Sequence, residues 1–237
     1  MPSAALVVRG APAVHGPAAA PARPSNLAAR RVIVRGDARY ADGMLKLTLD
    51  HNCIIDLDED RQPQASCLHE LLELHDAGSL EIRLTAVSAA EKPYGKPHLT
   101  NLGEFQERLE TLGIERLELL KPIAYLGIAF LDWCVLGGGE LSQLDERIHK
   151  ALFPDLPMKL AEYIELRADQ DPVKLERDWR NKKCDVLSMW CHVYYGGDIF
   201  VTSDKNFFEK LSPLLEIGAG DILRPCDAVA RIGEHAT

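Results

Sequence analysis

The chain has 237 residues, of which 46% are apolar and 27% charged, a composition typical of a globular domain with a filled core. Its longest apolar stretch, residues 122–139, contains Asp132 and is shorter than the run of about 20 apolar residues that spans a bilayer, so the sequence predicts no membrane segment. The net charge of −9 is uneven, because residues 1–40 hold six arginines against Asp37, a charge of +5, and the remainder carries −14. An acidic body does not indicate nucleic-acid binding through overall charge, and it favours a cluster of carboxylates that binds cations.

The two segments 1–40 and 41–237 are predicted to differ in order. The first is rich in Ala, Pro and Arg and lacks the apolar surface that offsets the entropy of folding. We therefore predict a disordered tail over 1–40 and one domain over 41–237. The Arg-rich, acid-poor composition of the tail also fits an organellar transit peptide, and a plain linker is the alternative.

The cysteines form no CxxC pair, and a chain of this size does not need disulfides to hold its core. We predict free, mostly buried thiols in a reducing cytoplasm. The six residues are Cys53, Cys67, Cys134, Cys184, Cys191 and Cys226.

Two successive strand-to-helix units open the predicted domain. Alternating apolar residues predict a strand over 45–49 that passes directly into a helix, with Asp50 at the junction. After a helix over 65–77, a second strand over 79–87 leads into a helix whose first turns contain Glu91. Each unit therefore has an acid at the carboxyl end of its strand.

The second half of the chain continues to alternate between helical and strand patterns. Residues 124–133 read as either a strand or a buried helix, because periodicity does not separate the two. The other predicted elements are helices over 101–113, 140–153, 158–168 and 174–197, a strand over 198–204, a helix over 205–215, and a strand followed by a helix over 220–232.

This alternation predicts an α/β protein with three layers, a central and mostly parallel sheet covered by helices on both faces. Ligands bind such sheets at the carboxyl ends of their strands. Asp50, Glu91 and Asp204 are all predicted to lie there, and Asp185 is predicted to join them from the long helix. A single acid at a helix start is explained by capping, but Asp185 lies within a helix and needs no such explanation.

Four carboxylates gathered at one edge repel one another unless a divalent cation binds between them. Ligands that are all oxygen favour Mg²⁺ or Mn²⁺ over Zn²⁺. Such a site is typical of phosphoryl transfer, in which the metal polarises the phosphate and activates a water molecule.

Four segments, taken in order, resemble the successive motifs of the PIN-domain family of metal-dependent ribonucleases: LTLDHNCIIDL, LTAVSAAEK, KKCDVLSMW and DIFVTSDKNFF. The resemblance implies a PIN-like fold, an RNA substrate cut at its phosphodiester bonds, and Mg²⁺ or Mn²⁺ as cofactor. The catalytic, metal-binding residues that it implies are Asp50, Glu91, Asp185 and Asp204. By the same resemblance, Asn52 and Thr202 or Ser203 orient these carboxylates by hydrogen bonding.

Several basic residues precede Asp185, and Lys205 follows Asp204. We predict that Lys205, Arg180 and Lys183 bind the substrate backbone, although a salt-bridged helix face explains the last two equally well. Asp56, within an acidic run, is predicted to lie at a solvated helix end.

Glu91 and Asp185 are 94 residues apart, more than expected for the small toxin-type members of the family. The extra residues predict an enlarged helical insertion at about 100–175. It could remodel the substrate groove, mediate self-association into a homodimer or enlarge the core. An inhibitory protein partner, as in toxin–antitoxin pairs, is a further expectation from the family.

A non-catalytic PIN-like scaffold that binds nucleic acid or protein is the alternative function. A phosphatase of the haloacid-dehalogenase type also begins with an acid after its first strand, but that chemistry needs a second acid two residues later, where this chain has Asn52.

Overall fold

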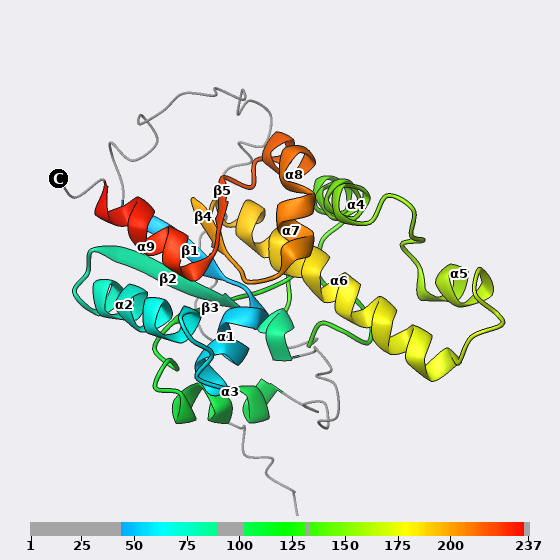
Figure 1. Cartoon of the computed structure of the whole chain (residues 1–237). Helices are drawn as coiled ribbons and strands as arrows, with labels where there is room; N and C mark the ends of the chain where they lie inside the picture. The colour runs from blue at the N-terminus through cyan, green and yellow to red at the C-terminus, as the bar shows by residue number, and fades with distance from the viewer. Residues whose placement is uncertain (1–43, 90–101, 131–132, 235–237) are drawn as a thin grey trace, which may run out of the picture. The chain divides into compact units, whose positions relative to one another are not determined.

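The computed structural model describes residues 44–89, 102–130 and 133–234 (Figure 1). The predicted tail over 1–40 and Glu91 lie outside the described residues. No helix in the described ranges is long and apolar enough to cross a membrane.

The centre of the fold is a sheet to which the described chain contributes five strands, all parallel, in the order β3-β2-β1-β4-β5. The strands are β1 (Leu45–Leu49), β2 (Leu80–Thr85), β3 (Glu118–Leu120), β4 (Ile199–Val201) and β5 (Asp221–Leu223). Helices cover both faces, so the predicted three-layer α/β/α class is confirmed.

The helices cover the two faces in blocks along the chain. A 3₁₀ turn at Ala86–Ala89 follows β2. One face is covered by α1 (His51–Asp58), α2 (Gln64–Asp76), α3 (Leu102–Thr111) and α9 (Pro225–Gly233). The other is covered by α4 (Glu140–Leu152), α6 (Pro172–Tyr194), α7 (Lys205–Glu209) and α8 (Leu211–Ile217), and α5 (Leu160–Glu165) packs against α6.

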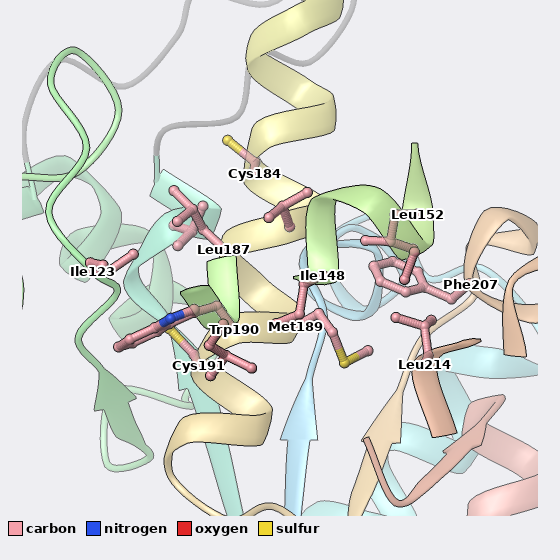
Figure 2. Close-up of a cluster of buried hydrophobic side chains, with 14 of the residues drawn as sticks. Ile123, Ile148, Leu152, Cys184, Leu187, Met189, Trp190, Cys191, Phe207 and Leu214 are labelled. Carbon is pink, nitrogen blue, oxygen red and sulfur yellow. The ribbon is translucent and has the colours of Figure 1, made fainter. Parts of the chain in front are cut away.

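Alternation along the strands decides which side chains meet each helical layer. Leu47, Leu49 and Ile82 point into the core under α1, α2 and α9. On the opposite face the strands supply Phe200 and Ile222, and Figure 2 shows side chains of α4, α6, α7 and α8 meeting in this second cluster. The region predicted as an insertion thus contributes to both cores, through α3 on one side and α4 on the other.

The polar residues of the second face bond to α6 and to the residue that follows it. Thr48 Oγ1 lies 2.9 Å from His192 Nδ1, and the guanidinium of Arg83 donates to the Tyr195 carbonyl at 3.1 Å. Both strand residues are buried, so each needs a partner there. These bonds, together with apolar packing, fix where α6 lies on the sheet.

Three local predictions differ from the structure. The segment predicted as one helix over 205–215 is two short helices, α7 and α8, which meet at Lys210. Residues 124–130 form neither a strand nor a helix but a turn, in which Gly127 has a φ of +80°. The edge strand β3 was missed, because three residues are too few to show a period.

The prediction that all cysteines are free is wrong for two of them. Cys67 of α2 and Cys226 of α9 form a disulfide, with Cα atoms 5.1 Å apart. The two helices pack side by side on the same face of the sheet, which brings residues 159 apart in sequence together. A disulfide is typical of oxidising compartments, so these cysteines no longer support the predicted reducing cytoplasm.

We expect reduction of this disulfide to lower the free energy of unfolding by about 2–4 kcal/mol, because the bond closes a long loop in the unfolded chain. Urea denaturation with and without a reducing agent measures the difference. The Cys226→Ser variant should match the reduced wild type and show no response to the reducing agent. Equal stability of the oxidised and reduced wild type would contradict the prediction.

Candidate functional site

The strand order places a topological switch point between β1 and β4. From β1 the chain runs outward through β2 to β3, and it then returns to the other side of β1 with β4. Ligands of open parallel sheets bind beside such a point, at the carboxyl ends of the strands. Asp50 follows β1 directly and Asp204 follows β4 after two residues, so these two acids flank the switch point.

Asp50 is buried, with 1% of its surface exposed, and begins α1 without capping it. Its side chain makes no N-cap hydrogen bond, although a hydrogen bond from the backbone N–H of His51 lowers its pKa. Instead, Asp50 Oδ2 accepts from Thr202 Oγ1 at 2.7 Å and from Asn52 Nδ2 at 3.3 Å. Capping therefore does not explain this acid.

Burial raises the pKa of Asp50 from 3.8 to about 6, since a charged carboxylate loses its hydration there. The hydrogen bond from Thr202 lowers the pKa, and the nearby charge of Asp204 raises it. The fold thus holds Asp50 with a raised pKa and near enough to Asp204 for the two charges to interact.

Thr202 connects these two acids. Its hydroxyl donates to Asp50 and accepts from the backbone N–H of Asp204 at 3.0 Å. The Asp204 side chain caps α7, since its Oδ1 accepts from the Asn206 N–H at 2.9 Å. Capping, the alternative explanation for an acid at a helix start, therefore holds for Asp204 and leaves its second oxygen, Oδ2, outside the cap.

Asp185 lies in the middle of α6 and is partly buried. Desolvation raises its pKa well above the ordinary value, and the charges of Asp50 and Asp204 raise it further, while Lys182 lowers it. None of the described residues forms a hydrogen bond or ion pair with its carboxylate. The charges of Asp50 and Asp204 therefore act on Asp185, and within the described ranges no bonded partner stabilises the charge of Asp185.

Buried hydroxyl groups fix α6 next to the end of β2, one turn after Asp185. Thr85 Oγ1 lies 3.2 Å from Ser188 Oγ and 3.4 Å from Ser88 Oγ. We did not predict these three residues as part of the site. A hydroxyl at the last position of a strand, as in Thr85, is the signal that the sequence offered.

The predictions for Ser203 and Asp56 need correction. Ser203 Oγ bonds to Asp56 Oδ2 at 2.6 Å rather than to any of the predicted catalytic acids within the described ranges. Asp56 is not at a solvated helix end, because it is only 3% exposed. Its position in α1 directs it inward, since residues four apart, such as Asn52 and Asp56, share one face of a helix.

The prediction that Lys183 binds substrate is also corrected. Its side chain is 1% exposed, and its ammonium group lies 2.7 Å from both carboxylate oxygens of Asp145. The ammonium group also lies 4.5 Å from the ring centroid of Tyr125. Lys183 is therefore a core residue that cannot reach a substrate phosphate.

The other two predicted substrate-binding residues differ in whether they already bind other parts of the protein. Arg180 donates to the Gly127 carbonyl and lies 3.5 Å from Glu176 Oε1, so it anchors the 124–130 turn. Lys205 is exposed at the start of α7, next to Asp204, and forms no ion pair within the described chain. Lys205 remains a candidate for phosphate contact.

The donor set fits a hard divalent cation, because carboxylate oxygens are the ligands that Mg²⁺ and Mn²⁺ prefer. The distances between the described side chains, in contrast, do not form a complete metal site. In the ranges that the structure describes, no three or more His, Cys, Asp and Glu side chains lie close enough together to hold a metal ion. The predicted fourth ligand, Glu91, lies outside those ranges.

The sequence was also compared with known proteins. No protein-family model matches the chain, and a search of curated proteins finds no significant match.

Proposed function

We propose that the protein is a PIN-like, metal-dependent ribonuclease whose site lies at the carboxyl ends of β1 and β4. The observation that carries the proposal is Asp185, a mid-helix carboxylate without a bonded partner in the described chain, whose pKa is raised by burial and by the charges of Asp50 and Asp204. Such an arrangement costs stability, because a desolvated carboxylate near other negative charges resists ionisation. A fold that keeps it at a topological switch point is typical of a functional site.

Mg²⁺ or Mn²⁺, when bound, would polarise the scissile phosphate and lower the pKa of a bound water molecule. Asp50, Asp185 and Asp204 would hold the cation only together with Glu91, because no three such side chains of the described ranges lie close enough together to hold it. Asn52 and Thr202 orient the Asp50 carboxylate through their hydrogen bonds to Oδ2. Lys205, exposed beside Asp204, would contact the phosphate backbone of RNA.

Asp185 offers the sharpest test of this function. We expect Asp185→Asn to reduce Mn²⁺-dependent cleavage of a fluorescent single-stranded RNA by about 100-fold or more, because the loss of one ligand weakens the transition-state stabilisation that the cation supplies. Asp178→Asn is the matched control, since Asp178 lies two turns earlier on α6 and pairs with Arg177 at 3.7 Å. Equal cleavage by the wild type and Asp185→Asn would contradict the proposal.

The second candidate function is a non-catalytic scaffold that binds nucleic acid or protein. The spacing of the described acids favours this scaffold function, because no three of them lie close enough together to hold a metal ion. Titration with Mn²⁺ separates the two functions. A catalytic protein should gain thermal stability as the metal binds, whereas a scaffold without a metal site should not. An RNA substrate, an inhibitory partner and a homodimer would each be tested with the same protein by binding assays and sedimentation.

A further inference from the structure

We propose that Asp56 is a positioning residue of the proposed site, acting through Ser203 on the turn that carries Thr202 and Asp204. The inference rests on the proposed metal-dependent function. It adds a residue on α1 whose hydrogen bond and ion pair within the described chain go to Ser203 and Arg61 rather than to the predicted catalytic acids.

The contact itself is short and buried. Ser203 Oγ donates to Asp56 Oδ2 at 2.6 Å, and Asp56 is 3% exposed. The other oxygen, Oδ1, faces Arg61 Nη1 at 3.6 Å. A hydrogen bond to a charged acceptor at this distance is stronger than one between neutral groups, so it holds Ser203 firmly against α1.

Ser203 is the middle residue of the turn between β4 and α7. Its neighbour on one side, Thr202, bonds to Asp50, and its neighbour on the other side, Asp204, caps α7. Anchoring the middle residue restricts the backbone on both sides. The Asp56–Ser203 bond thereby fixes the distance between Asp50, at the start of α1, and Asp204, at the start of α7.

Packing alone does not account for an acid at this position. Burial of a carboxylate carries a desolvation cost, and Arg61, whose side chain is 51% exposed, offsets it only in part. An apolar side chain of similar size would fill the same space without that cost. What an apolar side chain cannot supply is the acceptor for Ser203.

The test compares three variants in the full chain: Asp56→Ala, Ser203→Ala and the double variant. The main measurement is the Mn²⁺ dissociation constant without RNA, followed through the signal of free Mn²⁺ in electron paramagnetic resonance. We expect each single variant to weaken Mn²⁺ binding about 10-fold or more, the effect typical of groups that orient metal ligands. The double variant should equal the single ones, because the two residues act through one contact.

Two further variants separate positioning from general stability. Ser203→Thr keeps the hydroxyl and should restore Mn²⁺ binding to within about 2-fold of the wild type. Asp76→Ala removes an exposed acid that pairs with Arg116 at 2.6 Å, and it should leave Mn²⁺ binding unchanged. Ser203→Ala removes only one oxygen atom, so it tests the inference even where Asp56→Ala does not fold.

The outcomes distinguish this inference from the proposed function. Wild-type protein that neither binds Mn²⁺ nor cleaves RNA would overturn both. Wild-type protein that binds Mn²⁺, with Ser203→Ala binding it equally well, would overturn the role of Asp56 alone. Parallel loss of binding in both single variants, without a further loss in the double variant, would support it.

Discussion

Replacing Asp50 with asparagine is expected to abolish metal-dependent cleavage and, at neutral pH, to make the metal-free protein more stable. The activity should fall by about 100-fold or more, since Asp50 is the central acid of the proposed site. The stability should rise because burial raises the pKa of Asp50 to about 6, so that ionisation at pH 7 costs free energy in the folded state.

The size of the gain follows from the pKa. A rise from 3.8 to about 6 is about 2 units, equivalent to ~3 kcal/mol between the neutral and charged forms. Asparagine keeps the shape and can still accept from Thr202, but it loses the stronger bonds that a charged group makes. We therefore expect a net gain of about 1–3 kcal/mol at pH 7.

Asp50 makes the free energy of unfolding fall as the pH rises. The folded protein retains a proton on Asp50 that the unfolded chain releases between pH 3.8 and about 6. The stability associated with the protonated group is present below this window and is lost as the pH rises through it. The amide of the Asp50→Asn variant does not titrate. The variant should therefore become more stable relative to the wild type as the pH rises from about 4 to 6.

Urea denaturation of the metal-free proteins across about pH 4 to 7.5 measures this difference, and cleavage assays run in parallel. Asp198→Asn is the control, because Asp198 precedes β4 and accepts from the Lys46 N–H at 2.9 Å, at the amino ends of the strands. It should keep its cleavage activity and gain no stability. An Asp50→Asn variant that is active, or less stable than the wild type at pH 7, would contradict the prediction.

Replacing Lys183 with methionine is expected to lower the free energy of unfolding by about 3–5 kcal/mol, the typical cost of leaving one partner of a buried ion pair alone. The change leaves Asp145 with a side chain that is 11% exposed and has lost both of its contacts with the ammonium group. The double variant Lys183→Met with Asp145→Leu should recover most of the loss, because apolar residues can replace a buried pair.

Lys182→Met is the matched control for this effect. Lys182 is the neighbouring residue on α6, is only partly buried, and donates to the Asp178 carbonyl at 3.4 Å. Its replacement should cost less than about 0.5 kcal/mol. Urea denaturation compares the three variants with the wild type. A loss of RNA affinity in Lys183→Met without a loss of stability would show instead that Lys183 binds the substrate.

The sequence indicated the acids of the candidate site more clearly than their surroundings. Asp50 and Asp204 were found because parallel strands bring their carboxyl ends to one edge, a rule that needs only the order of elements. Burial depends on the packing of distant helices, and no local pattern reveals it. Asp56 and Lys183 were therefore misjudged, since their partners Ser203 and Asp145 lie 147 and 38 residues away.

By itself, the sequence determined the alternation of strands and helices, and hence the three-layer class, because hydrophobic periodicity is a local property of the chain. It also determined that acids follow β1 and β4. Only the tertiary structure decided that β4 lies beside β1, that the charges of Asp50 and Asp204 act on Asp185, and that Cys67 pairs with Cys226. These are contacts between segments far apart in the chain, and they form only when the helical layers close on the sheet.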